Sequence, residues 1–248
     1  MVGILSDIGN VRKLNEDYAD YYEGGDIKLY VIADGMGGHN AGEVASKIAV
    51  EATMEYIKEK KDIIENEIGS ILEDAVKYAN TKIYEKSKKS ETLSGMGTTI
   101  TACLIKNNNM VVANVGDSSC FSVTKDGIKK ITKDHSLVQQ LVDTGTITEE
   151  EAMTHPNKNI ITRALGTGEF VDVDIFNINL TEAYKCVLST DGLTNEVTTK
   201  EIYDIAIKNN NNVACRKLVE LSKIKGSRDN ISVIVFGGEC KDDRNCSK

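Results

Sequence analysis

Five aspartates stand beside short runs rich in valine, isoleucine and threonine, a composition typical of β-strands. Asp34 follows "LYVIA", Asp117 follows "MVVANVG" and Asp191 follows "CVLST". Asp229 lies just before "NISVIVF", and Asp17 belongs to "RKLNED", after the first such run. Carboxylates gathered at strand ends supply the oxygen ligands that Mg²⁺ and Mn²⁺ prefer.

A single aspartate at a strand end is more often a turn residue that caps the strand. Five acids in similar places, in a chain with only three histidines, favour a carboxylate-lined metal cluster instead. Neighbouring carboxylates repel one another, and a cation in their midst relieves that repulsion. We therefore expect the five aspartates to converge on metal.

The glycine-rich stretch "DGMGGHNAGE" (residues 34–43) joins a strand pattern to a helix pattern, an arrangement that often cradles phosphate. A Walker-type loop is excluded because Glu43 occupies the lysine position and reverses the charge. The dinucleotide pattern fails because Asn40 stands where its third glycine belongs. An EF-hand fails because acids are missing at the third and fifth loop positions.

The bulk composition bounds the class of protein. A length of 248 residues fits one large domain or two small ones, and one proline with no Gly/Ser-rich stretch leaves no evident linker. A net charge of −8 argues against non-specific nucleic-acid binding, which requires a basic face. We expect no nucleic-acid partner.

Nothing in the sequence points to a membrane or an oxidising compartment. The six cysteines form no CxxC pair and no regular spacing, so we expect reduced thiols rather than a zinc site or a disulfide framework. The N-terminus lacks an apolar run of signal-peptide length, and no stretch approaches the roughly 20 apolar residues that span a bilayer. We expect a cytoplasmic protein.

The elements that must position the acids follow from the periodicity of the chain. Strand patterns occupy residues 2–8, 28–33, 98–105, 110–115, 119–124, 184–189 and 230–236. Helical patterns occupy residues 41–61, 63–88, 198–208 and 212–225. Runs of strands interrupted by helical pairs predict an α+β fold with antiparallel sheets and helices outside.

Eight segments together resemble the metal-dependent serine/threonine protein phosphatases, the type 2C or PPM family, in its bacterial form. They occur in the family's order over about residues 6 to 236: "SDIGNVRKLNED", "VIADGMGGHNAGEVAS", "GMGTT", "NVGDSS", "DHSLVQQLVDTGTITEEEA", "HPNKNIITRALG", "LSTDGLTNEV" and "SRDNISVIV". One fragment alone would be weak evidence, whereas eight in register are strong evidence.

The resemblance implies two packed antiparallel β-sheets flanked by helix pairs, with the metal site at one end of this α-β-β-α sandwich. It implies one phosphatase domain over residues 1–240, which includes a mobile segment, the flap, at about residues 132–168. We expect residues 241–248 to form a short disordered tail, since "CKDDRNCSK" has no apolar periodicity.

The resemblance also assigns roles to residues. Asp34 would bridge two metal ions, and the carbonyl of Gly35 would bind the first of them. Asp191 and Asp229 would bind the second ion, and Asp117 with Asp191 would match an additional metal site of bacterial relatives. Two further acids and one cation complete the implied site: Glu16 and Asp17 would act through metal-bound waters, and Arg12 would clamp the substrate phosphate.

The implied reaction is direct hydrolysis of phosphoserine or phosphothreonine by a water that bridges two metals. The implied cofactors are Mn²⁺ or Mg²⁺, two ions in the core site and a third beside them. Phosphorylated signalling proteins, including a bacterial-type Ser/Thr kinase, are the implied partners. No segment has the pattern of an interface, so we expect a monomer.

Several residues of the implied site keep two interpretations. His39 could act as general acid or could order the glycine loop by a hydrogen bond; Met36 stands where eukaryotic relatives place a histidine. Arg163 in the flap could be solvated or could contact substrate. For His135 and His155 we expect turn and cap hydrogen bonds, and for Ser136 we expect a helix N-cap.

Two alternatives belong to other classes. "DVDIF" (172–176) and "STDGLT" (189–194) resemble the nucleophile motif of haloacid-dehalogenase enzymes, but the first has Phe176 where the motif expects Thr or Val, and the second has Ser189 in place of the nucleophilic Asp. A non-catalytic phosphoprotein-binding member of the fold would lack metal-site acids, and here Asp34, Asp117 and Asp191 are all present with Asp229.

Overall fold

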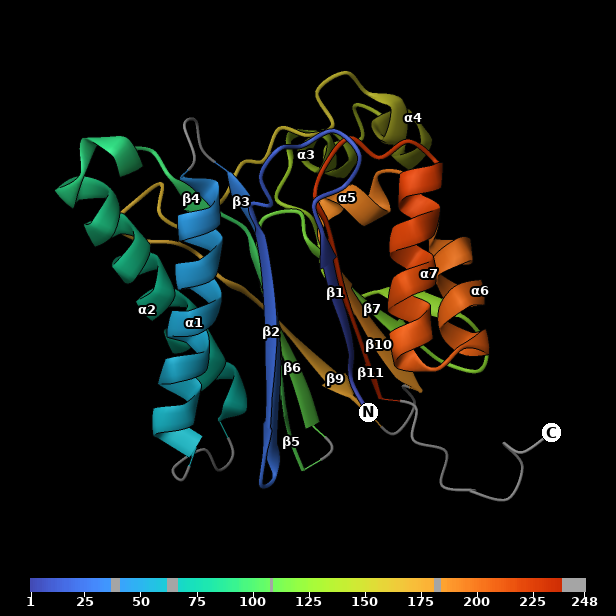
Figure 1. Ribbon diagram of the computed structural model, residues 1–248, viewed down its shortest axis with the longest axis horizontal. Helices are drawn as coiled ribbons and strands as arrows, with labels where there is room; N and C mark the ends of the chain where they lie inside the picture. The colour runs from blue at the N-terminus through green and yellow to red at the C-terminus, as the bar shows by residue number, and fades with distance from the viewer. Residues whose placement is uncertain (37–40, 62–66, 108, 181–183, 238–248) are drawn as a thin grey trace.

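Two antiparallel sheets lie face to face at the centre of the computed structural model, which describes residues 1–36, 41–61, 67–107, 109–180 and 184–237. A pair of helices covers the outer face of each sheet (Figure 1). The layers therefore follow the order helix, sheet, sheet, helix. This confirms the predicted α+β sandwich.

The first sheet has the strand order β1-β11-β10-β7-β8, and the second has the order β2-β3-β5-β6-β9 with β4 paired to β3. The strands of the first sheet are β1 (Gly3–Asp7), β7 (Ser119–Val123), β8 (Ile128–Lys130), β10 (Lys185–Ser189) and β11 (Ile231–Gly237). Those of the second are β2 (Asp17–Gly24), β3 (Ile27–Met36), β4 (Gly97–Thr98), β5 (Ile100–Lys106), β6 (Asn109–Val115) and β9 (Asp174–Asn179).

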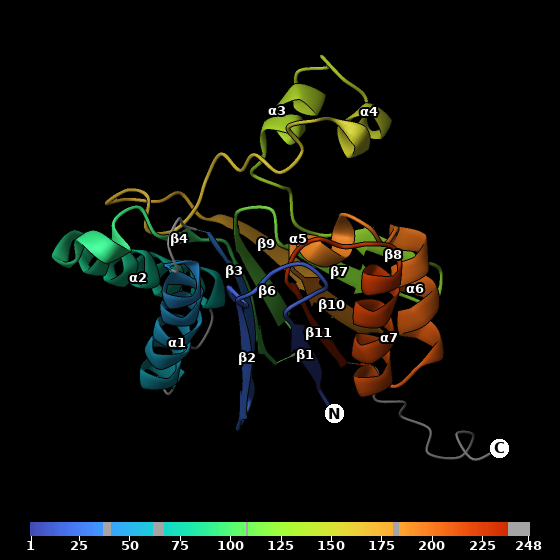
Figure 2. The ribbon, with the colours of Figure 1, turned by 45° about the horizontal axis from the view of Figure 1, so that its top comes forward.

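Long helices cover the sheets and short ones lie near one end of the sandwich. The second sheet is covered by α1 (Gly42–Lys60) and α2 (Ile68–Lys89), and the first by α6 (Thr199–Lys208) and α7 (Asn211–Ile224). The short helices are α3 (Leu137–Asp143), α4 (Glu149–Thr154) and α5 (Asp191–Thr194), with a 3₁₀ turn at Glu91–Leu93. Figure 2 shows that α3 and α4, within the predicted flap, project beyond the end of the sandwich.

Alternation along the central strands builds three hydrophobic layers. In β3, Leu29 and Val31 pack with α1 and α2, whereas Tyr30 and Ile32 point between the sheets. In β11, residues 231, 233 and 235 pack in the cluster with the helices of the first sheet. Because both faces of these strands are buried, their sequences are continuous apolar runs instead of alternating ones.

The strands that sequence reasoning missed are edge strands. β2 and β9 form the two edges of the second sheet. Edge strands bury less side-chain surface, so "DYADYYEG" and "DIFNIN" keep polar residues that mask the strand pattern. The helices α4 and α5 were also missed, because six and four residues are too short for a periodic signal.

The described cysteines agree with the expectation of reduced thiols, since Cys103, Cys120, Cys186 and Cys215 are buried and free. Within the described ranges, no helix combines the length and the apolar character that crossing a bilayer requires. The predicted tail at 241–248 lies outside the described residues.

A matched pair of isoleucine substitutions tests the layer between the sheets. Ile234 is fully buried there, whereas Ile224 at the end of α7 is 75% exposed. We expect Ile234→Ala to lower the free energy of unfolding by about 2–5 kcal/mol, because it leaves a cavity. Ile224→Ala should change it by less than about 0.5 kcal/mol. Urea denaturation measures both, and equal losses would contradict the assignment of this layer.

Candidate metal centre

The pairing of β2 with β3 brings two of the predicted acids together. Asp17 is the first residue of β2, and it lies directly opposite Asp34 in the antiparallel register. Directly opposed residues of an antiparallel pair have Cβ atoms about 4.5–5.5 Å apart. Only 6% of the surface of Asp17 is exposed. The sheet itself therefore places two carboxylates side by side.

Three backbone segments meet at Gly35, and their close contact explains why this position requires a glycine. A Cβ atom there would lie 2.1 Å from the carbonyl oxygen of Gly42 and 2.5 Å from that of Glu16. The amide of Gly35 donates to the Glu16 carbonyl at 3.0 Å. Any larger residue at position 35 would push apart β3, the start of α1 and the loop that enters β2.

The "GTT" segment forms hydrogen bonds with both the backbone amide and the backbone carbonyl of Asp34. The Asp34 amide donates to Thr99 Oγ1 at 2.9 Å, and the Asp34 carbonyl accepts from Thr98 Oγ1 at 2.8 Å and from the Thr99 amide at 2.9 Å. Thr99 Oγ1 also lies 2.7 Å from the hydroxyl of Ser118, the neighbour of Asp117. Thr99 therefore connects the segments that carry Asp34 and Asp117.

The electrostatics show that the predicted acids share one environment. Burial, and then the negative charges of Asp17, Asp191, Asp117 and Asp229, raise the pKa of Asp34 well above its usual value. Burial likewise raises the pKa of Asp17 to about 7 and that of Asp117 to about 8. The pKa of Asp191 is also raised, by burial and by the charge of Asp229.

Protein donors hold several of these carboxylates. Three of them accept hydrogen bonds from side chains: Asp229 from Arg12 at 2.8 Å, Asp17 from Thr190 at 2.9 Å, and Asp191 from Asn195 at 3.0 Å. In this arrangement, no three His, Cys, Asp or Glu side chains of the described residues form a group that could hold a metal ion. A cation bound among the acids would replace some of these hydrogen-bond partners.

Two orphaned oxygens indicate that the donor set fits a hard cation. Asp17 Oδ1 and Asp191 Oδ1 are buried, and no hydrogen-bond donor of the described chain contacts them. Buried carboxylate oxygens without a partner are costly. Oxygen ligands of this type suit Mg²⁺ or Mn²⁺.

A short loop between β1 and β2 carries Arg12 and Glu16, and one buried amide fixes it. Asn230 donates from Nδ2 to the carbonyls of Ile8 and Leu14 at 2.9 and 3.0 Å, and its Oδ1 accepts from the Glu16 amide at 2.8 Å. The loop is thereby tied to the residue next to Asp229. Arg12 is half exposed at the mouth of the site.

The flap residues have the partners expected of structural groups, with one correction. Ser136 caps α3 by accepting from the Gln139 amide, and His155 accepts from the Asn157 amide, as predicted. Arg163 is not a free surface arginine: its guanidinium, 33% exposed, pairs with Asp174 at 2.6 Å. This ion pair joins the flap to the start of β9, an edge strand that the sequence did not reveal.

Two observations remain on the predicted residues and on those that sequence reasoning missed. His39 lies outside the described residues. Sequence reasoning missed Thr99, Thr190, Asn195 and Asn230, although "GMGTT" and "SRDN" lay within the quoted motifs. Their role is visible only from contacts that join distant parts of the chain.

Removing one titratable acid from the cluster should stabilise the protein in chelator. Acids with raised pKa values keep protons in the folded state up to about pH 7–8 and lose them near pH 4 when unfolded, so their cost in stability grows as the pH rises through this window. We expect Asp34→Asn to raise the melting temperature at pH 8 by about 2–4 °C, or roughly 1 kcal/mol, and by less at pH 5.

The control for this measurement is Asp126→Asn, in the exposed turn between β7 and β8, which should leave the melting temperature unchanged. Scanning calorimetry in EDTA checks both variants. An Asp34→Asn protein that melts at or below the wild-type temperature at pH 8 would contradict the repulsion argued here.

Comparison with known proteins agrees with this geometry. A family model described as protein phosphatase 2C matches residues 10–215. The serine/threonine phosphatase stp of Listeria innocua is 37% identical over 234 residues, covering 93% of this chain and 92% of its own. A crystal structure of a bacterial serine phosphatase has a TM-score of 0.91 at 34% identity, covering 97% of this chain and 98% of that one.

A further solved structure bears on the metal question. The catalytic domain of the serine/threonine protein phosphatase PstP, solved in complex with two manganese ions, has a TM-score of 0.82 and 34% identity. It covers 95% of this chain and 96% of its own. With the match to the family over most of its length, the chain belongs to the protein phosphatase 2C family and is a serine/threonine protein phosphatase.

Proposed function

We propose that this phosphatase hydrolyses phosphoserine and phosphothreonine by direct attack of a water molecule, with two divalent metal ions in the carboxylate cluster. The observation that carries this proposal is the burial of Asp34 directly opposite Asp17, where burial first and then the charges of four aspartates raise the pKa of its carboxyl. When bound, two ions would lower the pKa of a shared water and balance charge on the attacking and leaving oxygens.

The proposed ligands are those expected from the resemblance. Asp34 and the carbonyl of Gly35 would hold the first ion, and Asp191 and Asp229, again with Asp34, would hold the second. Asp117 serves a third ion together with Asp191. The two orphaned oxygens, on Asp17 and Asp191, support an oxygen-ligated cation at this place.

The remaining residues act on water and phosphate. Glu16 and Asp17 would orient water by accepting its hydrogen bonds, a role that suits a partly buried carboxylate beside Gly42 and a buried one opposite Asp34. Arg12 would bind the non-bridging oxygens of the phosphate, since a guanidinium can donate two parallel hydrogen bonds. Its exposed position, in contact with Asp229, supports an encounter with incoming substrate.

The cofactor is proposed as Mn²⁺ or Mg²⁺, because both accept the same oxygen ligands. PstP, the structural relative with two manganese ions, supports the count of two in the core site. The general acid for the leaving group is unassigned, and His39 is one candidate for it.

The proposed substrates are phosphorylated proteins, among them a bacterial-type Ser/Thr kinase.

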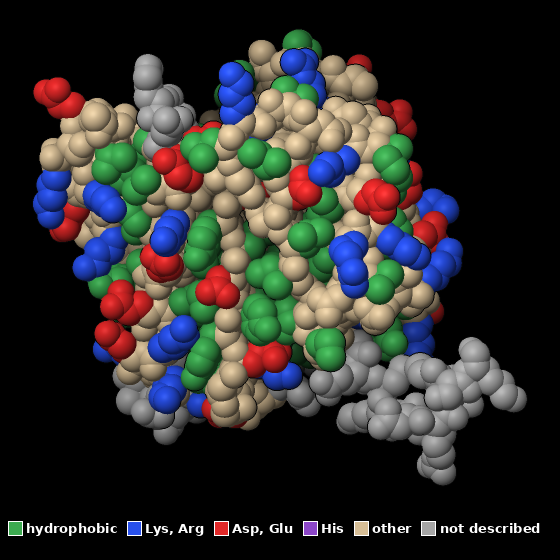
Figure 3. Space-filling view, in the orientation of Figure 1, with side chains coloured by type: hydrophobic (Ala, Val, Ile, Leu, Met, Phe, Trp, Pro, Cys, Tyr) green, Lys and Arg blue, Asp and Glu red, His purple; other side chains and the backbone are tan. Residues whose placement is uncertain are grey.

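We propose a cytoplasmic monomer formed by one domain over residues 1–240, acting without nucleic acid. The net charge of −8 supports the last point. On the face drawn in Figure 3, lysine and arginine side chains are interspersed with acidic ones among the described residues.

Turnover with and without metal tests the proposal. We expect chelator-stripped protein to leave a phosphothreonine peptide intact and to hydrolyse it after addition of Mn²⁺. Asp34→Ala and Asp229→Ala should each lower kcat by about a thousandfold or more, because an oxygen ligand of the proposed ions is lost. Phosphate release over time is the measurement.

The matched control is Asp204→Ala, an acid on α6 that pairs only with surface lysines and should keep full activity. Activity that persists in EDTA, or near wild-type turnover of Asp34→Ala, would refute the two-metal proposal.

A further inference from the structure

His135 holds the residue that precedes Asp117 at two points. The His135 amide donates to the Gly116 carbonyl at 2.9 Å, and the Gly116 amide donates back to His135 Nδ1 at 3.0 Å. The imidazole is buried, with 8% of the side chain exposed. One histidine thus satisfies both backbone polar groups of Gly116 and fixes the loop that carries Asp117.

Steric contacts allow the backbone of that loop few other conformations. Gly116 has φ +106°, a value that side-chain-bearing residues rarely adopt, and a Cβ there would lie 2.5 Å from Thr99 Cγ2. Asn114 adds a third contact by donating from Nδ2 to the Gly116 carbonyl at 3.2 Å. The same amide donates to the Lys133 carbonyl at 3.2 Å.

The hydrogen bond at Nδ1 decides which ring nitrogen carries the proton. Since Nδ1 accepts from Gly116, the proton of the neutral ring lies on Nε2. Nε2 lies 3.1 Å from Asp174 Oδ2 and 3.0 Å from Arg163 Nη1. Asp174 is therefore the acceptor shared by the histidine and the arginine. Although burial raises the pKa of Asp174, these two donors hold it below its usual value.

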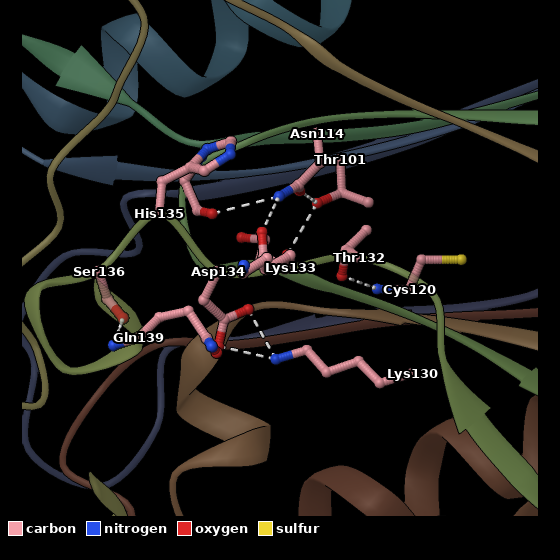
Figure 4. Close-up of polar contacts among 12 residues, drawn as sticks. Thr101, Asn114, Cys120, Lys130, Thr132, Lys133, Asp134, His135, Ser136 and Gln139 are labelled. Carbon is pink, nitrogen blue, oxygen red and sulfur yellow. Dashed lines mark hydrogen bonds and ion pairs between the residues drawn. The ribbon is translucent and has the colours of Figure 1, made fainter. Parts of the chain in front are cut away.

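The two ends of the flap meet at His135. Its carbonyl accepts from the Thr162 amide at 2.7 Å, and Ser136 and Ile161 form an antiparallel bridge. Arg163 follows directly on the exit side. Asp174, which receives both side chains, pairs with Asn114 across β9 and β6. Figure 4 shows His135 and Ser136 on the same chain segment as Lys133, with Asn114 beside that segment.

We propose that His135 is a positioning residue whose two ring nitrogens perform separate tasks. Nδ1 orients the Gly116–Asp117 loop, and Nε2 holds the flap by donating to Asp174, the carboxylate that also pairs with Arg163. The inference rests on the proposed function, because it takes Asp117 as a metal ligand. It adds that the flap, whose helices project beyond the end of the sandwich, contacts the phosphoprotein substrate. In this role, the side chain of His135 couples the binding of metal to the binding of substrate.

Two substitutions separate the tasks. In His135→Asn, the amide oxygen keeps an acceptor near the place of Nδ1, and nothing reaches Asp174. In His135→Gln, the longer side chain keeps a donor near the place of Nε2, and the acceptor for Gly116 is lost. A residue that merely fills the core would not distinguish these two losses.

The measurements are Mn²⁺ affinity by titration calorimetry and KM for a phosphothreonine peptide at saturating Mn²⁺. We expect His135→Asn to raise KM by about three- to tenfold with Mn²⁺ affinity unchanged. We expect His135→Gln to weaken at least one Mn²⁺ binding step by about tenfold, the range seen when groups that orient metal ligands are removed, with KM nearly unchanged.

A second variant keeps the test decisive if His135 proves necessary for folding. Asp174→Asn alters only the Nε2 side, on a carboxylate that is 37% exposed, and should raise KM without a change in Mn²⁺ affinity. Gln140→Ala, which removes an exposed contact to Thr162, is the control in the flap and should change neither quantity.

Parallel changes in both quantities for Asn and Gln, or no change in either, would overturn the role given to His135. So would an Asp174→Asn protein that keeps the wild-type KM. In each case the wild-type enzyme still turns over the peptide with Mn²⁺. A wild-type protein that fails to do so refutes the proposed function instead, and the calorimetric titration still reports on the metal-binding half of the inference.

Discussion

Repulsion among carboxylates at one end of the sandwich is the constraint that the surrounding structure must withstand. Asp17 and Asp34 face each other across β2 and β3, and the charges of three more aspartates act on Asp34. The hydrophobic layers on both faces of the second sheet offset this cost, because β3, a central strand buried on two sides, keeps its register with the edge strand β2. The acids can therefore stay close together while the fold remains intact.

Backbone contacts transmit this rigidity to the flap from two sides. On the entry side, His135 holds Gly116, which precedes Asp117. On the exit side, Leu165 exchanges both backbone hydrogen bonds with Thr98, whose hydroxyl donates to the carbonyl of Asp34. At its entry the flap contacts Gly116, the neighbour of Asp117, and at its exit it contacts Thr98, which is hydrogen-bonded to Asp34. A displacement of the flap would therefore also displace these two proposed metal ligands.

The sequence was informative where burial is complete and local. Central strands such as β5 and β11 are continuous apolar runs, and the acids beside them stand out because strand ends are easily located. The edge strands β2 and β9 were missed because half-exposed residues keep polar side chains. Asn230 could not be assigned, since its partner Glu16 is 214 positions away in the chain. Arg163 was placed between two interpretations because its partner Asp174 lies on one of the missed strands.

Arg12 and Asp229 illustrate why the proposed phosphate-binding role suits a guanidinium. Asp229 Oδ2 accepts from Arg12 at 2.8 Å, and Oδ1 accepts from the Asn230 amide at 2.9 Å, so the carboxylate is oriented from both sides. That hydrogen bond raises the pKa of Arg12 and keeps it cationic. A guanidinium has five donors in a fixed plane, so one can orient Asp229 while others remain available to phosphate oxygens. A lysine ammonium, with a compact charge on a flexible stem, could not hold both partners in one geometry.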